Sequence, residues 1–252
     1  MEKFLINLEQ FFKKIEGYQI LIIGIFFSLC LVISTNIVAG TLSRSGIEVT
    51  GSAVAIVKSD FASWDLDIET GSIDKKYAYD VLVKNRNTVL NYLKSKGFKN
   101  SEIQVQNTDS YPVFKKSKEN GEDTNEVDHY YFVQTIRIES NNLQLIKEVS
   151  LDAENLLNKG INIKSNPPNY FYTKLSDLKI KLLNEASEDA KKRAKAMLKS
   201  TGNRVGEIKS VKTGVFQITA PNSNEVSDYG IYDTSTIEKK VTAVTQVTFR
   251  IK

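Results

Sequence analysis

The chain has 252 residues, of which 41% are apolar and 25% charged, and this composition excludes collagen-like, disordered and disulfide-framework proteins. Its 34 Lys and Arg against 30 Asp and Glu give a net charge of +4, a mild excess that does not favour nucleic acid as a partner. One Cys and one His exclude Cys/His zinc clusters, CxxC redox motifs and any triad with two imidazoles. We expect no cofactor, metal or catalytic residue.

An uncharged segment lies near the N-terminus. No charged residue occurs from Gly17 to Ser43, and Ile, Leu, Phe and Val dominate residues 18–38. About 20 apolar residues, each rising 1.5 Å along a helix, cross a hydrocarbon core roughly 30 Å thick. The sequence therefore predicts a transmembrane helix over 18–38, with the lipid bilayer as its partner.

The flanking charges predict the orientation of this helix. Lys13 and Lys14 precede it and Arg44 stands alone after it, which by the positive-inside rule keeps the N-terminus in the cytoplasm. We expect a single-pass protein of the inner (cytoplasmic) membrane with a periplasmic C-terminal domain. The predicted parts are a cytoplasmic N-terminus at 1–17, the membrane helix at 18–38, a linker at 39–46 and an extracytoplasmic domain at 47–252.

The first residues have a helical apolar spacing that is typical of an amphipathic segment at the membrane surface. The residues that carry it are Phe4, Leu8, Phe11, Phe12 and Ile15. A cleaved signal peptide is the competing interpretation, because Val38-Ala39-Gly40 offers small residues at a cleavage position. The long apolar run and the long N-terminal segment favour an uncleaved anchor. Cys30 is expected to be an apolar filler of this helix.

Beyond the apolar segment, hydrophobic periodicity predicts strands and helices in alternation. Asp74 is placed as the N-cap of the first helix, and Gly97 as its end. The order ββαββαβαββ predicts an α+β fold in which helices pack on largely antiparallel sheets. The expected strands are 47–57, 64–69, 103–114, 127–140, 161–173, 205–219 and 237–251, and the expected helices are 74–96, 143–157 and 174–200.

The sequence also predicts two polar loops and one alanine seam, which is a row of alanines on one face of the longest helix. The loops at 115–126 and 220–236 are expected at the surface. In the longest helix, three alanines four residues apart predict a narrow buried face that allows a close approach to a sheet. The expected buried residues are Leu175, Leu178, Leu182, Ala186, Ala190, Ala194 and Met197.

With these motifs in order, residues 47–251 resemble the SIMPL domain proteins, which are similar to periplasmic immunogenic antigens of the bacterial envelope. The quoted segments are Ile47-Glu48-Val49-Thr50-Gly51-Ser52, Lys58-Ser59-Asp60-Phe61-Ala62, Gly97, Ile103, Tyr111-Pro112, the strand from Tyr131 to Ile138, and the alanine helix followed by Gly202 and Gly206. The resemblance implies an exported, non-enzymatic domain of unknown function, ring-like self-assembly in some members, and no catalytic residues to carry over. Ala53 departs from a glycine that many members have, and the two loops follow no family pattern.

Three groups of residues are candidates for a site. Asp65, Asp67 and Glu69 share one strand face and offer oxygen ligands for a hard cation, but a row on one strand favours a solvated face. His129 is an acid or base near neutral pH, but a lone His beside a polar loop favours surface decoration. A third group has aromatic side chains that suit an interface or, more simply, the core. These are Tyr130, Tyr131, Tyr170, Phe171 and Tyr172.

The leading hypothesis is a membrane-anchored extracytoplasmic binding or assembly module that contacts envelope proteins through 115–126 and 220–236. The alternative is a carboxylate-dependent envelope hydrolase that uses His129, which requires two buried carboxylates beside this residue. A third hypothesis is a homo-oligomer, which requires an apolar or aromatic patch exposed on the monomer.

Overall fold

The computed structural model describes residues 6, 13, 18–42, 46–117 and 121–252. These residues form an α+β protein with two antiparallel sheets, except for one short parallel pair, and four α-helices. The chain divides into two compact units. The first contains Met1–Gly51, Glu188–Lys212 and Gln246–Lys252, and the second contains Ser52–Ser187 and Thr213–Thr245.

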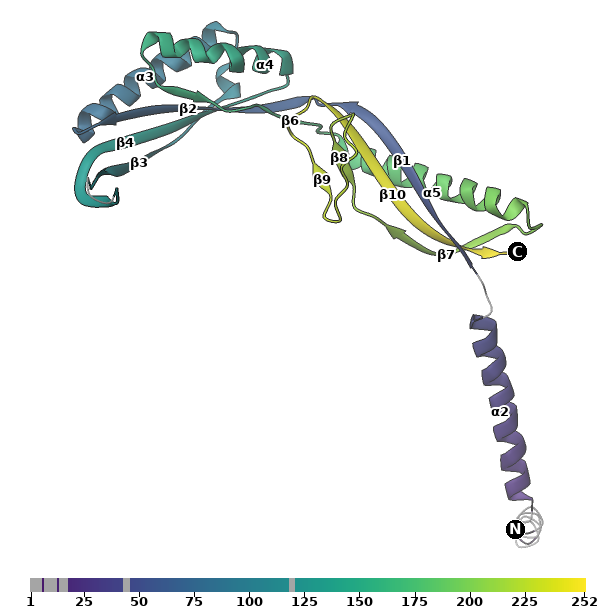
Figure 1. Cartoon of the computed structure of the whole chain (residues 1–252). Helices are drawn as coiled ribbons and strands as arrows, with labels where there is room; N and C mark the ends of the chain where they lie inside the picture. The colour runs from purple at the N-terminus through teal and green to yellow at the C-terminus, as the bar shows by residue number, and fades with distance from the viewer. Residues whose placement is uncertain (1–5, 7–12, 14–17, 43–45, 118–120) are drawn as a thin grey trace. The chain divides into compact units, whose positions relative to one another are not determined.

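One sheet lies entirely in the second unit. Its strands are β2 (Phe61–Ser72), β3 (Ile103–Lys116), β4 (Asp123–Ser140), β5 (Ile163–Ser165) and β6 (Asn169–Phe171). The order is β3-β4-β2-β5, and β6 also pairs with β2. Helices α3 (Lys75–Ser95) and α4 (Leu143–Asp152) cover one face of this sheet (Figure 1). The opposite face carries the row Asp65, Asp67 and Glu69.

The capping residues at both ends of α3 are those that the sequence predicts. The Asp74 side chain accepts hydrogen bonds from the backbone N–H groups of Lys76 and Tyr77, which satisfies two donors of the first turn. Gly97 follows the helix at φ +106°, a conformation that favours glycine. The apolar stripe of α3 packs on β2 and β4 around the fully buried Trp64. This core also contains Leu66, Ile68, Leu82, Leu93, Ile136, Ile138 and Ile146.

The second sheet consists of β1 (Gly46–Lys58), β7 (Val205–Thr213), β8 (Gln217–Thr219), β9 (Ile231–Tyr232) and β10 (Glu238–Ile251). Its order is β1-β10-β8-β9, and β7 pairs with β10. Strands β8 and β9 are parallel. Helix α5 (Leu175–Lys199) supplies apolar side chains to the cores that this sheet forms.

The predicted alanine seam of α5 is confirmed. Ala186 packs with Ile218 and Val241 in the second unit, and Ala190 and Ala194 pack in the first unit. One position of the predicted buried face is wrong. Met197 is 57% exposed and Leu198 is buried, because the buried row advances by four residues from Leu182 to Leu198.

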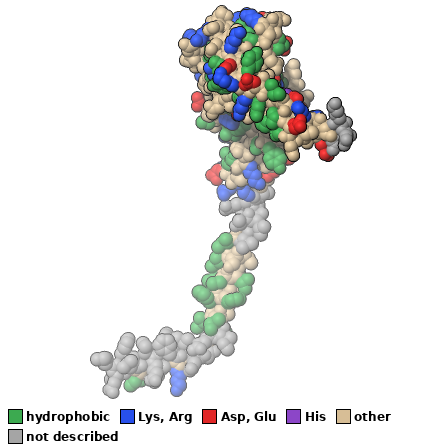
Figure 2. Space-filling view, turned by 90° about the vertical axis from the view of Figure 1, so that its left-hand side faces the viewer, with side chains coloured by type: hydrophobic (Ala, Val, Ile, Leu, Met, Phe, Trp, Pro, Cys, Tyr) green, Lys and Arg blue, Asp and Glu red, His purple; other side chains and the backbone are tan. Residues whose placement is uncertain are grey.

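Helix α2 (Gln19–Leu42) occupies most of the apolar segment near the N-terminus. Its described large apolar side chains, among them Leu21, Phe26 and Phe27, are exposed. Figure 2 shows hydrophobic side chains along this helix. In the described stretches, no helix combines the length and the apolar character needed to cross a membrane. The prediction of a transmembrane helix over 18–38 is therefore not confirmed. The predicted amphipathic segment at 1–17 lies outside the described residues, apart from positions 6 and 13.

The predicted order ββαββαβαββ is correct up to the end of the second helix of the domain and too coarse afterwards. The extended stretch 161–173 is two short strands, β5 and β6, and the expected strand 205–219 is divided into β7 and β8. The loop 220–236 contains β9. The helix expected over 143–157 changes at Ala153 to a 3-10 helix, Ala153–Lys159, that ends at Gly160.

Candidate functional site

The acidic row of β2 is paired across the sheet. Arg137 on β4 donates two hydrogen bonds of 2.8 Å to the carboxylate of Asp65. Thr135 donates to Asp67 Oδ1 at 2.6 Å, and Asn166 donates to Asp67 Oδ2 at 2.9 Å. Since β4 and the β5 region supply these donors, the row is an internal polar network of the sheet surface.

Glu69, the last member of the row, has two partners of its own. The hydroxyl of Tyr131 donates a short hydrogen bond to Glu69 Oε2, and Asn162 donates to the same oxygen at 3.1 Å. Burial, and then the bond to Glu69, raise the pKa of Tyr131. Within the described residues, no group of three or more His, Cys, Asp or Glu side chains is arranged to hold a metal ion.

His129 lies on β4, an inner strand of this sheet, where it pairs with Val113 of β3. Its Nδ1 is 2.8 Å from Asp128 Oδ2, and the Asp128 side chain is 53% exposed. The hydrolase hypothesis requires two buried carboxylates beside this imidazole, whereas in the described part of the chain the carboxylate that His129 contacts belongs to this exposed neighbour. The structure therefore does not bring together the acid–base group that this hypothesis needs.

The aromatic residues predicted for an interface or a core are dispersed. Tyr170 is buried in the core under α3 and α4, and Tyr130 packs against the same core. Phe171 contacts Phe61, with the ring centroids 6.3 Å apart. Together with the paired Tyr131, they form no single exposed aromatic patch.

The loop at 220–236 is held firmly at its C-terminal end by a buried lysine that the sequence analysis did not single out. The side chain of Lys239 is 1% exposed, and its Nζ donates to the carbonyl oxygens of Asp233 at 2.6 Å and Thr236 at 2.8 Å. Burial lowers the pKa of Lys239, and the Asp233 carboxylate, 3.8 Å away, partly opposes this shift. Position 239 continues the inward alternation of Val241 and Ala243, and this is the signal that could have identified it.

Further bonds fix the middle of the loop. The Gln217 side chain donates to Ser227 O at 2.7 Å and accepts from Ser227 N at 3.3 Å. The backbone N–H of Tyr170 donates to Thr234 O at 2.7 Å. The loop is thus an ordered surface of the second unit, and two of its exposed apolar residues are Val226 at 80% and Tyr229 at 97%.

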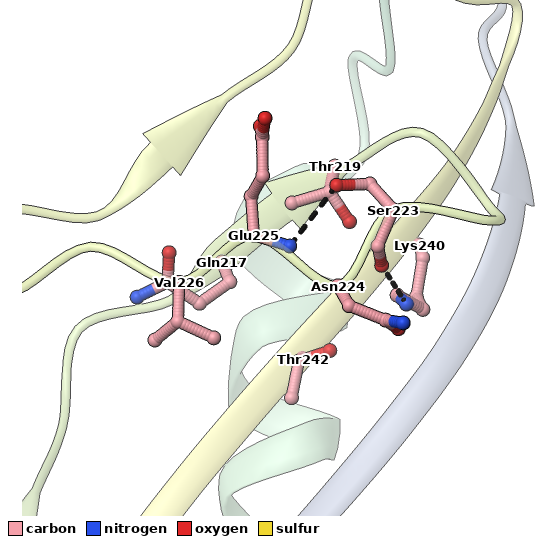
Figure 3. Close-up of a pocket in the computed structure, with 8 residues that line it drawn as sticks. All are labelled: Gln217, Thr219, Ser223, Asn224, Glu225, Val226, Lys240 and Thr242. Atoms are coloured by element: carbon pink, nitrogen blue, oxygen red, sulfur yellow. Dashed lines mark hydrogen bonds between the residues drawn. The ribbon is translucent and has the colours of Figure 1, made fainter.

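A pocket lies beneath the first half of this loop (Figure 3). The strand register pairs Thr219 with Lys240 and Gln217 with Thr242, so these four side chains share one face of the β8–β10 pair. Residues 223–226 cover this face and leave a cavity of about 190 Å³. Sequence reasoning placed the loop at the surface but gave no signal for this cavity, because it depends on how the loop folds back.

The other predicted contact loop, 115–126, is a hairpin turn between β3 and β4. Ser117 N donates to Glu122 O at 2.8 Å, and Lys115 forms an ion pair of 3.1 Å with Glu126. Residues 118–120 lie outside the described part of the chain, so the structure defines the base of this loop.

The model of a family described as SIMPL, a protein of unknown function (DUF541), matches residues 47–249, which is most of the chain. No curated protein matches the chain.

Proposed function

Because this chain belongs to the SIMPL family, whose function is unknown, we propose a role from its own surface. The role is that of a non-enzymatic binding module of the bacterial cell envelope, anchored in the inner membrane by its N-terminal segment, that contacts a partner protein through the loop 220–236. The observation that carries this proposal is the exposure of Tyr229, at 97%, on a loop fixed by buried hydrogen bonds.

A fixed loop with exposed apolar groups suits binding for a thermodynamic reason. Association costs free energy for each side chain and loop that must be ordered, and Lys239 and Gln217 already order this loop. Aromatic residues supply much of the binding energy at protein interfaces. Tyr229 and Val226 therefore offer a contact that a partner can bury at a small entropic cost.

Photocrosslinking tests the contact surface. A photoreactive aromatic amino acid replaces Tyr229 in the full chain, and the matched control carries it at Tyr77, which is 62% exposed on α3. We expect a discrete crosslinked species from position 229 alone, abolished when Val226→Ser is added. Equal products from both positions, or the same product after Val226→Ser, would contradict the proposal.

His129→Gln separates the binding role from the hydrolase alternative. The proposal expects unchanged crosslinking from position 229 in this variant. A hydrolase that depends on His129 would lose turnover of an envelope substrate, and nothing in the geometry around Asp128 favours this outcome.

The anchor is supported by the chemistry of α2. Its described large apolar side chains are exposed, and Ser34, Thr35 and Asn36 each donate to a carbonyl oxygen four residues earlier. Polar groups satisfied within the helix are tolerated in lipid. We expect the full chain to stay in membranes after extraction with alkaline carbonate, and release into the supernatant would contradict the anchor. The mass of the mature protein distinguishes an intact anchor from cleavage after Ala39.

A second candidate role is self-association. Strand β1 lies at the end of its sheet order, and Val54 and Ile56 on its outer face are 55% and 58% exposed. An edge strand with exposed β-branched side chains is a template for pairing with another chain. This observation favours assembly of copies through β1.

A further inference from the structure

The pocket beneath residues 223–226 contains a buried hydroxyl group with no hydrogen-bond partner. Thr219 is 3% exposed, and within the described residues its Oγ1 atom has no hydrogen-bond partner. Buried polar groups in proteins are almost always paired, so an orphan hydroxyl that lines a cavity indicates a missing partner in that cavity.

The charge in the pocket comes from Lys240, the cross-strand neighbour of Thr219. Its ammonium group has three donors, and in the described part of the chain it gives one to the carbonyl oxygen of Ser223. Glu225 is the acidic residue of the lining, but Figure 3 shows its side chain extending away from Lys240 and Thr242. The lining therefore combines one cation with the side chains of neutral polar residues.

We propose that this pocket binds a small monocarboxylate, with the carboxylate between Lys240 Nζ and Thr219 Oγ1. The single positive charge of Lys240 is neutralised by a monoanion, whereas a dianion such as phosphate would keep one uncompensated negative charge in the pocket. The cavity of about 190 Å³ is smaller than the pockets that hold drug-sized ligands, so the ligand is no larger than an amino acid or a sugar acid.

This ligand site goes beyond the proposed docking role and does not depend on it. The docking surface is the outer side of the loop at Tyr229, whereas the pocket lies between the loop and the β8–β10 strands. Loss of either activity leaves the other measurable, because crosslinking tests the first and ligand titration tests the second.

The experiment is an NMR titration of the full chain in detergent micelles with methyl-labelled threonine. The probes are acetate, lactate and glucuronate, compared with the neutral isostere lactamide and with inorganic phosphate. We expect the methyl signals of Thr219 and Thr242 to shift with carboxylates at concentrations up to about 50 mM, where a site with a Kd of about 1 mM is saturated. The methyl signal of Thr245, which lies on β10 like Thr242 but outside the pocket lining, is expected not to shift.

Two variants, Thr219→Val and Lys240→Gln, test the ligand site, and a third is the control. Thr219→Val keeps the shape of the side chain and removes the orphan hydroxyl, so we expect a higher midpoint of thermal unfolding together with carboxylate binding weakened about tenfold. Thr245→Val is the matched control, since Thr245 Oγ1 is also buried and has no partner in the described structure. It is expected to raise the midpoint and leave binding unchanged. Lys240→Gln is expected to abolish the response.

Each other outcome overturns the proposal. A response to lactamide equal to that of lactate means that the charge is not recognised, and a response to phosphate alone assigns the site to a different anion. Absence of shifts with all three carboxylates, or unchanged binding in Thr219→Val, removes the site. If Lys240→Gln fails to fold, Thr219→Val still tests the ligand site, because this variant keeps the hydrogen bond from Lys240 to Ser223.

Discussion

Arg137 and Asp65 face each other directly across the β4–β2 ladder and share two parallel hydrogen bonds of 2.8 Å. The side chains are 42% and 31% exposed, so water screens the pair. Their geometry fixes one end of the polar network that continues through Asp67 and Glu69. The pair therefore contributes more to the order of this face than to the global free energy of unfolding.

A double-mutant cycle with Arg137→Gln and Asp65→Asn measures this contribution. We expect a coupling free energy of about 0.2–1 kcal/mol, decreasing as salt is added, since exposed pairs are weak and screened. Denaturant unfolding of the four proteins provides the values. A coupling well above this range, insensitive to salt, would show that the pair behaves as a buried one.

The acidic row shows where sequence reasoning succeeds and where it ends. The strict alternation at Trp64, Leu66 and Ile68 correctly places Asp65 and Asp67 on the other face, because the strand period is two residues. The partners Arg137 and Asn166 come from distant parts of the chain, and their contact depends on strand register. The period of one strand restricts the register between strands to steps of two residues, but it does not choose among those steps.

A hydrogen bond of 2.7 Å from Tyr92 Oη to Asp152 Oδ2 joins α3 to the end of α4, and Lys96 Nζ lies 2.6 Å from the same oxygen. These donors, with Asn155, lower the pKa of Asp152 from 3.8 to about 2. A carboxyl group whose pKa is lower in the folded state stabilises the fold above its unfolded pKa, and this stabilisation is lost as the pH falls. We expect the free energy of unfolding of Asp152→Asn to decrease less than that of the unmodified protein as the pH falls from 3.8 to about 2.

Thermal unfolding at several pH values checks this expectation. A second readout is the tyrosine titration, because burial and the bond to Asp152 raise the pKa of Tyr92. Asp152→Asn removes the negative charge beside the phenol and is expected to lower that pKa. An unchanged acid limb and an unchanged Tyr92 titration would mean that this contact does not persist in solution.

Lys239→Met tests the buried lysine that fixes the loop 220–236. The substitution removes the donor from the carbonyl oxygens of Asp233 and Thr236, and two carbonyls without a donor cost on the order of 1–3 kcal/mol each. Removal of a buried charge offsets part of this cost. In Lys239→Met we expect faster hydrogen exchange at the Tyr170 amide, which donates to Thr234 O. The control is Lys58→Met, at an exposed position of β1, which is expected to leave this exchange rate unchanged. Unchanged protection in Lys239→Met would contradict the role of this lysine.

The pH dependence of stability gives an independent check of the same residue. Burial lowers the pKa of Lys239 in the folded state below the ordinary 10.5. The unfolded chain therefore binds more protons in this window, and the contribution of Lys239 to stability rises as the pH increases towards 10.5. Lys239→Met is expected to remove this rise, and its persistence in the variant would assign it to other groups.

The region after 160 was predicted least well, and the reason is physical. Strands β5, β6, β8 and β9 have three residues or fewer, too short for a periodic pattern. Three of them pair with long strands, β5 and β6 with β2 and β8 with β10, and β9 pairs with β8 in turn. Long periodic elements such as α5 were predicted closely, since their pattern repeats over many turns.

Ala186→Leu tests the close approach that the seam of α5 allows. Ala186 is fully buried against Ile218 and Val241, and a larger side chain there must displace its neighbours. We expect a loss of about 1–3 kcal/mol in the free energy of unfolding. Ala196→Leu, at an exposed position of the same helix, is the matched control and is expected to change stability by less than about 0.5 kcal/mol. Equal effects at both positions would mean that the seam is not tightly packed.

The mass of the full chain in detergent micelles, measured by light scattering after size exclusion and corrected for detergent, tests assembly through β1. Exposed Val54 and Ile56 lie on β1, which stands at the end of its sheet order, where another strand can pair. If copies pair there, the protein mass is a discrete multiple of 28.4 kDa. Val54→Lys with Ile56→Lys is expected to reduce it to one chain, because charges on an edge strand oppose pairing.

The control for this experiment places lysines at Tyr77 and Ile180, which are exposed on α3 and α5, and is expected to keep the mass of the starting protein. An oligomer that survives the β1 substitutions would move the interface elsewhere. A monomer at all concentrations would reject assembly, because the hydrophobic gain from burying Val54 and Ile56 would then be too small to offset the entropy of association. In that case the loop at Tyr229 stays as the contact surface, and the anchored single chain is the unit that binds.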